Sequence, residues 1–112
     1  MTPPPTLPRI VDALALPVPH DTELDVVAGS PTSGAVSLGV FGEVEIGVWE
    51  STPGVVRDIE AEEVFVVLSG EGEVRLSSGE ALSLRPGVVV RLYAGERTEW
   101  EIRSTLRKVY LA

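Results

Sequence analysis

The chain has 112 residues, and 44% of them are apolar, which is enough to build one hydrophobic core and one domain. Its formal charge is −8, and such a surface repels the phosphates of nucleic acids and anionic lipid headgroups. No apolar stretch approaches the roughly 20 residues that span a bilayer, and the start lacks the layout of a signal peptide. We therefore expect a cytoplasmic protein that binds neither nucleic acid nor membranes.

The first part of the chain is rich in proline, with six of the nine prolines among residues 1–19. Each proline fixes its own φ and removes a backbone donor, so we expect residues 1–8 to form a polyproline-like or disordered tail. Residues 10–16 fit either one short helical turn or an edge strand. We divide the chain into a Pro-rich, partly disordered leader (1–20) and a folded domain (21–112). The only histidine, His20, falls in this leader and is expected on the surface.

After Leu24, apolar residues recur at every second position, which is the period of a β-strand. Turn residues such as Pro53-Gly54, the glycine-rich segment 69–72 and Pro86-Gly87 separate the apolar runs. About eight short strands with frequent turns indicate an all-β sandwich or barrel. The runs are, in chain order, 36–40, 44–48, 64–68, 74–76, 82–84, 88–93, 98–102 and 106–111.

Two segments resemble the conserved motifs of the cupin family. Residues 54–70, GVVRDIEAEEVFVVLSG, resemble the first motif, in which two His precede a Glu and a Gly follows; Glu63 and Gly70 have the required spacing. Residues 84–95, LRPGVVVRLYAG, resemble the second motif, in which a Gly turn leads to a third His. The resemblance implies a cupin (RmlC-like) jelly-roll barrel over 21–112 and a homodimer.

Two further segments narrow this resemblance. Residues 48–54, VWESTPG, and 100–110, WEIRSTLRKVY, are similar to those of the small single-domain cupins grouped with ureidoglycine aminohydrolase. Including the two motifs, the likeness covers about residues 26–112.

The metal ligands of the family do not carry over. Their spacing places the two His positions on Arg57 and Ile59 and the third on Thr98, so only Glu63 matches. Imidazole nitrogens suit the transition metals that cupins hold, whereas the cation of Arg57 would repel a divalent ion. The chain also has no Gln, which serves as a ligand in the namesake aminohydrolase. We therefore expect no metal and no cofactor.

Glu63 is the main candidate for a site residue. The barrel alignment turns its strand face inward, whereas the alternative is a solvated carboxylate in the acidic run 60–63. An inward carboxylate needs a partner, for which Arg57 is the first choice and Lys108 the second. Trp100 either lines this pocket or packs in the barrel or a dimer interface. The predicted ligand-binding residues lie on the inward faces of three strands: Arg57, Glu63, Phe65, Thr98 and Trp100.

Lys108 is the only lysine of the chain. On the final strand it shares a face with Tyr110, and the opposite face, with Arg107, has the more core-like pattern. Lys108 and Tyr110 therefore lie either on the outer wall or in a polar pocket of the barrel mouth. Together with Glu63 they are the candidates for acid–base catalysis.

Three functions fit these residues, and the sequence leaves open whether the chain is an enzyme. The first is a metal-free cupin that binds a small polar or carboxylate-bearing metabolite in the mouth of the barrel. The second is a lyase, isomerase or hydrolase, similar to ureidoglycine aminohydrolase, that uses Glu63 as acid or base. The third is a structural dimerisation module with an aromatic outer face.

Overall fold

A computed structural model describes residues 6–112, and all regular structure in this range is β. The all-β prediction is therefore confirmed, while residues 1–5 of the tail predicted for 1–8 lie outside the described residues. Over 6–112 there is no helix that is long and apolar enough to cross a membrane. The strands are β1 (Asp21–Thr22), β2 (Val26–Ala28), β3 (Thr32–Phe41), β4 (Val44–Ser51), β5 (Gly54–Ile59), β6 (Glu63–Leu76), β7 (Ala81–Leu84), β8 (Val89–Leu92) and β9 (Arg97–Leu111).

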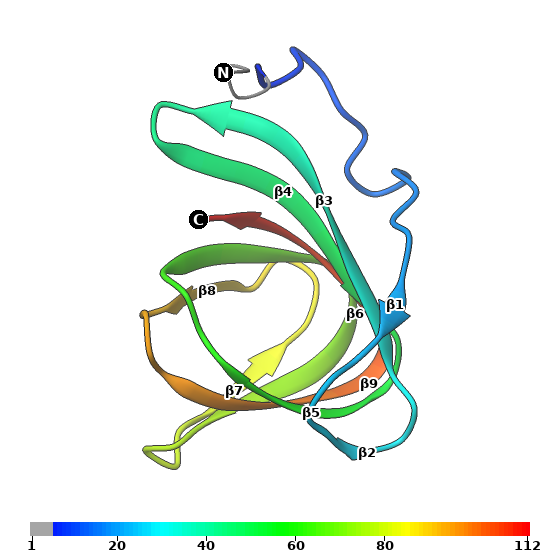
Figure 1. Cartoon of the computed structure of the whole chain (residues 1–112), viewed down its shortest axis with the longest axis vertical. Helices are drawn as coiled ribbons and strands as arrows, with labels where there is room; N and C mark the ends of the chain where they lie inside the picture. Colours follow the sequence, from blue (N-terminus) through cyan, green and yellow to red (C-terminus); the bar gives the residue numbers. More distant parts are fainter. Residues whose placement is uncertain (1–5) are drawn as a thin grey trace.

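Two long antiparallel strands, β6 and β9, form the centre of the barrel. The first half of β6 pairs with β8 and its second half with β7. The first half of β9 pairs with β5 and its second half with β4. Beyond these, β3 and β1 extend the sheet from β4, and β2 extends it from β5. Figure 1 shows the strands curling around a common interior, with the β3–β4 hairpin projecting beyond it.

The glycine-rich segment 69–72 does not form the predicted turn, because β6 continues through it. The register between β6 and β9 shifts at three places between Val67 and Gly72, so the strand bends from one half of the barrel to the other. Gly70 has a φ of +85°, and a Cβ there would lie 2.1 Å from the carbonyl oxygen of Thr105. Glycine is required at this bend rather than at a chain reversal.

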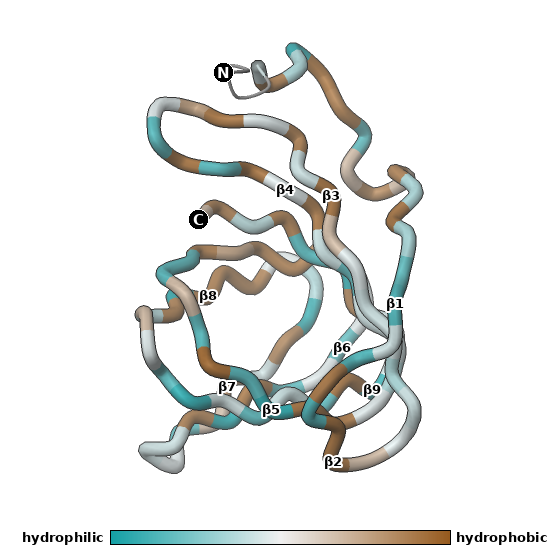
Figure 2. The backbone as a smooth tube through the Cα atoms, in the orientation of Figure 1, coloured by the Kyte–Doolittle hydropathy of each residue, from teal (hydrophilic) through white to brown (hydrophobic). Residues whose placement is uncertain are grey.

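Alternation along the strands separates the interior of the barrel from its surface. Figure 2 shows apolar and polar positions following one another along the β3–β4 hairpin. Burial of each large apolar side chain contributes about 1.5–3 kcal/mol to the stability of the fold. The interior cluster consists of Phe65, Val67, Val74, Leu84, Val90, Leu92, Trp100, Ile102 and Leu106.

Residues 6–20 run along the outer side of β3 (Figure 1). Leu16 donates a backbone hydrogen bond of 3.1 Å to the carbonyl of Asp12, so one turn forms here rather than an edge strand. Gly34 of β3 lies so close to the leader that a Cβ would be 1.8 Å from the carbonyl oxygen of Pro19. The boundary drawn at residue 20 stays a prediction.

Arg107 joins the leader to the outer face of the sheet. Its guanidinium donates to the carbonyl oxygens of Leu16 (2.6 Å) and Ala13 (3.0 Å) and to Glu50 Oε2 (2.9 Å). The other oxygen of Glu50 bonds His20 Nε2 at 2.9 Å. The prediction of His20 as a surface residue is wrong, because this bond holds the ring in a half-buried position with 18% of its side chain exposed.

Candidate functional site

Lys108 points into the barrel from β9, and its Nζ lies 2.6 Å from Glu63 Oε2 on β6. The lysine side chain is 6% exposed and that of Glu63 is 16% exposed. Lys108 is opposite Trp49 of β4 on one side and Val67 of β6 on the other, so the register fixes its inward direction. The sequence left open whether Lys108 lies on the outer wall or in a polar pocket of the barrel mouth, and the structure places it in the pocket. The partner of Glu63 is Lys108, the second choice, and not Arg57.

Three aromatic rings surround the ammonium group of Lys108. Its Nζ lies 4.1 Å from the ring centroid of Phe65, 4.7 Å from that of Trp100 and 4.9 Å from that of Trp49. Ring faces attract a cation but do not replace water as hydrogen-bond acceptors. Burial therefore lowers the pKa of Lys108, and the nearby carboxylate of Glu63 opposes this shift without cancelling it.

Glu60 is a second buried carboxyl group of the site, and the sequence did not single it out. It follows β5, and its Oε2 accepts hydrogen bonds from Thr98 Oγ1 (2.6 Å) and Trp100 Nε1 (2.9 Å). Burial raises the pKa of Glu60, although both hydrogen bonds act in the opposite direction. The site thus combines an amine that loses its proton more readily than usual with an acid that keeps its proton longer.

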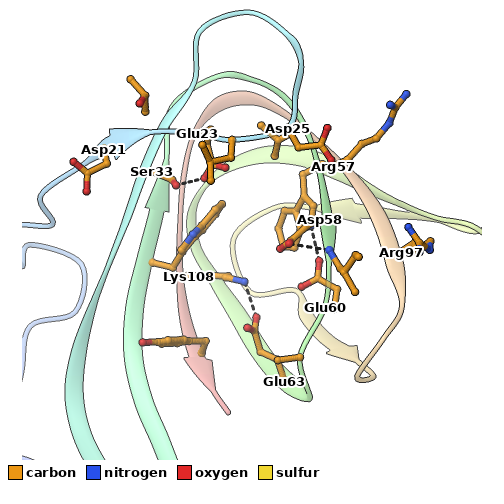
Figure 3. Close-up of a pocket in the computed structure, with 18 residues that line it drawn as sticks. Asp21, Glu23, Asp25, Ser33, Arg57, Asp58, Glu60, Glu63, Arg97 and Lys108 are labelled. Atoms are coloured by element: carbon orange, nitrogen blue, oxygen red, sulfur yellow. Dashed lines mark hydrogen bonds and ion pairs between the residues drawn. The ribbon is translucent and has the colours of Figure 1, made fainter.

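These groups lie at the floor of a cavity of about 920 Å³ that opens at the mouth of the barrel. Figure 3 shows Lys108, Glu63 and Glu60 directed toward a common space, while the guanidinium groups of Arg57 and Arg97 turn outward. Six acidic side chains and three basic ones line the cavity: Asp21, Glu23, Asp25, Asp58, Glu60 and Glu63 against Arg57, Arg97 and Lys108.

The five predicted ligand-binding residues occupy different depths of this site. Glu63 and Trp100 line the cavity at its floor, and Arg57 lies at the rim. Arg57 is 62% exposed there and pairs with Glu99 at 3.4 Å. Phe65 and Thr98 are buried behind the lining residues, Phe65 against Lys108 and Thr98 against Glu60. Their role in binding stays a prediction.

Tyr110, the other candidate for catalysis, also lines the cavity. Its hydroxyl donates to Glu45 Oε1 at 2.7 Å. Burial and this carboxylate raise the pKa of Tyr110, so the phenol keeps its proton and does not act as a base near neutral pH. Gly47 lies opposite the ring, and a Cβ there would come within 2.3 Å of it, so glycine leaves the space that the tyrosine occupies.

The register of β5 corrects the positions inferred for the missing metal ligands. Asp58 is opposite Thr98 of β9, and this pair faces the interior, whereas Arg57 and Ile59 face outward. The inward donors do not fit a transition metal, because no imidazole is among them and Lys108 already binds the carboxylate of Glu63. No group of three or more His, Cys, Asp or Glu side chains that could hold an ion is present in the described range.

An antiparallel barrel with bent central strands and a polar site in its mouth is an architecture that cupin domains share with other β-barrel and jelly-roll folds. The chain belongs to the family of EutQ-like cupin domains, whose model matches residues 38–110. The predicted cupin jelly roll is therefore confirmed. The narrower grouping with ureidoglycine aminohydrolase is not.

Solved structures agree with this fold. The structure of the Clostridium difficile EutQ protein has a TM-score of 0.74 and 16% identity, covering 91% of this chain and 83% of that one. An ethanolamine utilization protein Q from Salmonella typhimurium has a TM-score of 0.61 and 24% identity, covering 71% and 68%. A DUF861 family protein from Thermotoga maritima has a TM-score of 0.53 and 25% identity, covering 56% and 73%. No protein of curated function matches the sequence.

Proposed function

We propose that this cupin domain binds a small polar metabolite in the mouth of its barrel, where the Lys108–Glu63 pair and the surrounding aromatic rings contact it. The observation that carries this proposal is the cavity of about 920 Å³ whose floor holds that pair. Small-ligand sites combine aromatic walls with a few converging polar groups, and this floor has both.

The charge of the cavity favours a neutral or cationic ligand over the carboxylate-bearing one suggested by the sequence. Six acidic side chains line the space against three basic ones. Two of those cations, Arg57 and Arg97, turn away from it. The third, Lys108, is paired with Glu63, so this pair adds no net charge and five acidic side chains remain, of which Glu60 keeps its proton to higher pH than usual. A carboxylate entering this field would be repelled, whereas an ammonium or amide group would not.

Three compounds with the same two-carbon hydroxylated skeleton test this selection: ethanolamine as the cation, glycolamide as the neutral form and glycolate as the anion. The fold relative from Salmonella is named for ethanolamine utilization, which adds a reason to include the cation. We expect heat of binding in calorimetry from the first two compounds and none from glycolate. Preferential binding of glycolate would contradict the proposed charge class.

A pair of variants assigns the binding to this cavity. Trp49→Ala removes a ring that lines it, and Phe41→Ala removes an exposed ring at the end of β3. We expect at least tenfold weaker binding in Trp49→Ala and no change in Phe41→Ala, in line with the typical cost of removing an aromatic contact. Equal affinities in the two variants would place the ligand elsewhere.

An enzyme that uses the same floor is the second candidate. Lys108 and Glu60 have pKa values shifted toward neutrality, which is the property of acid–base groups. The resemblance to ureidoglycine aminohydrolase puts hydrolysis among the reactions to screen. If Glu63→Gln left every turnover found in such a screen unchanged, Glu63 would have no catalytic part. The homodimer and the cytoplasmic location stay predictions, and sedimentation velocity tests the first.

A further inference from the structure

We propose that Lys108 is a nucleophile that condenses with the carbonyl group of a small aldehyde or ketone to form an imine at the floor of the cavity. This proposal rests on the proposed function, because the same cavity must admit the compound. It names the class of ligand, a carbonyl compound, and the atom that binds it.

The first argument is the position of the amine. Lys108 is the only lysine of the chain, and it lines the cavity although its side chain is 6% exposed. The rings of Trp49, Phe65 and Trp100 surround its Nζ at 4.1–4.9 Å from their centroids. Figure 3 shows the amine directed toward the open space of the cavity. A ligand at the floor of the cavity would therefore lie next to the nitrogen and its partner Glu63.

The second argument is the state of the nitrogen. Only an unprotonated amine attacks a carbonyl carbon, and lysines become nucleophilic where a hydrophobic pocket desolvates them. Burial lowers the pKa of Lys108 in this pocket. Glu63 Oε2, 2.6 Å from Nζ, is placed to accept the proton that the amine must lose.

The third argument is the second carboxyl group. An imine forms only if the hydroxyl of the first adduct leaves as water, and this step needs a proton donor. Glu60 has a raised pKa because it is buried, so it retains its proton to higher pH than an exposed carboxyl group. Figure 3 shows it facing the same space as Lys108. One carboxyl group thus takes a proton, and the other supplies one.

The steps balance without any oxidant or reductant. Glu63 takes a proton from Nζ, the nitrogen pair bonds to the carbonyl carbon, and a proton moves from nitrogen to the former carbonyl oxygen. Glu60 then protonates that hydroxyl, the C–O bond breaks to release water, and the nitrogen pair forms the C=N bond. Glu63 then gives up the proton that it took from Nζ, and Glu60 takes up a proton, so both carboxyl groups regain their starting states. In sum, one lysine ammonium and one carbonyl compound give one iminium ion and one water.

The surroundings of the amine also suit the product. A protonated imine keeps its positive charge on the nitrogen, which is where the ring faces and Glu63 already stabilise a cation. The acidic lining of the cavity disfavours carbonyl compounds that carry a carboxylate. We therefore expect neutral or cationic aldehydes and ketones to react.

Reductive trapping with glycolaldehyde and cyanoborohydride tests the proposal on the full chain. The reduced adduct is stable, and peptide mass spectrometry separates Lys108 from the α-amino group and measures the labelling rate of each. We expect Lys108 to be labelled at least about tenfold faster in the native protein than in the urea-unfolded protein. If Lys108 is only a buried ion-pair partner, burial protects it, and the native rate is equal or slower; that result would overturn the proposal.

Two variants test the roles of Lys108 and Glu60 in imine formation while keeping the charge or the hydrogen-bond acceptor that the fold uses. Lys108→Arg keeps the charge and forms no imine, so its labelling should be confined to the α-amino group. Glu60→Gln keeps an acceptor for its two donors but loses the acid, so we expect native Lys108 to be labelled at least about tenfold more slowly. An unchanged rate in folded Glu60→Gln removes Glu60 from the mechanism. Binding of glycolamide without any adduct defeats this inference alone, whereas the absence of both defeats the proposed function as well.

Discussion

Arg107 and Lys108 are neighbours on β9, and both are buried cations, but they face opposite sides of the sheet. Arg107 lies on the outer face with 9% of its side chain exposed, and Lys108 lies in the interior with 6% exposed. Each is paired with one glutamate of an adjacent strand, Glu50 at 2.9 Å and Glu63 at 2.6 Å. The same formal charge is thus placed in two different environments only one residue apart.

The two environments differ in how completely they satisfy the cation. The guanidinium of Arg107 donates to a carboxylate and to two backbone carbonyls of the leader. Lys108 donates to one carboxylate, and ring faces rather than further hydrogen-bond acceptors surround the rest of its ammonium group. A cation held by three hydrogen bonds stabilises the structure, whereas a cation with one such bond at a cavity is available for binding and chemistry.

The carboxyl groups around the two cations behave in the same contrasting way. Burial alone would raise the pKa of Glu50, but hydrogen bonds from Arg107 and His20 outweigh it and lower the pKa. Burial raises the pKa of Glu60 in the interior despite the hydrogen bonds from Thr98 and Trp100. Glu50 therefore stays ionised to lower pH than an ordinary carboxyl group, whereas Glu60 keeps its proton to higher pH.

The largest effect that we expect is on the outer face. Arg107→Met leaves Glu50 half-buried without its cation and frees the leader, and breaking a buried ion pair costs about 3–5 kcal/mol. Urea unfolding measures the loss of stability. Arg85→Met, at an exposed position before the Pro86-Gly87 turn, is the matched control and should change the stability by less than about 0.5 kcal/mol. A loss below about 1 kcal/mol in Arg107→Met would show that the leader does not depend on this pair.

A smaller effect is expected in the interior, and it depends on pH. Lys108→Met leaves Glu63 next to the open cavity, so the loss at neutral pH should be about 1–2 kcal/mol. Because the folded-state pKa of Lys108 lies below its ordinary value of 10.5, the unfolded state binds more protons between the two values. The stability of the wild type should therefore rise with pH in this window, by at most about 1.4 kcal/mol per pH unit.

Urea unfolding between pH 7 and 10 compares the wild type with Lys108→Met. The rise should be missing in the variant, which has no amine at this position. If the difference in unfolding free energy between the two proteins stays constant over this range, Lys108 remains charged in the folded protein. The contrast between the two cations would then be one of position only.

The same two faces explain how far the sequence could predict the structure. Alternation predicted most strands, but β6 was divided at 69–72 because glycines that bend a strand look like glycines that reverse it. The face of β9 with Arg107 looked core-like, and a leader that the sequence placed apart from the barrel does cover Arg107, although Leu111 at the end of this face is exposed. Because neighbouring residues of a strand face opposite sides of the sheet, Lys108 points inward once Arg107 is known to lie on the outer face under the leader. The alternation of β9 alone does not tell which of its two faces is the outer one.

The sequence failed to indicate Glu60 as a site residue for a different reason. It belongs to an acidic run, 60–63, and such runs are usually solvated. Its inward direction depends on how the chain leaves β5 after Ile59 and on two donors that lie 38 and 40 positions further along the chain. The one signal in the sequence was Thr98, which the resemblance to cupins had already placed at a lumen position. An acid that could bond to Thr98 would have been the residue to look for.

The smallest effect that we expect comes from Glu60→Gln, and it sharpens the contrast between the inner and outer carboxyl groups. The pKa of Glu60 is raised above its ordinary value of 4.5, so the folded protein binds more protons than the unfolded one just above this pH. The stability contributed by the protonated group is present at low pH and is lost as the pH rises through the raised pKa, with a slope of at most about 1.4 kcal/mol per pH unit. Glutamine keeps an oxygen acceptor for Thr98 and Trp100 but has no proton to lose.

Unfolding titrations from pH 4 to 8 should therefore show a flatter dependence of stability on pH for Glu60→Gln than for the wild type. The control Glu43→Gln, at the exposed β3–β4 turn, should show the same dependence as the wild type. Parallel profiles for all three proteins would mean that Glu60 is ionised like a surface carboxylate, and the floor of the cavity would then lack its acid.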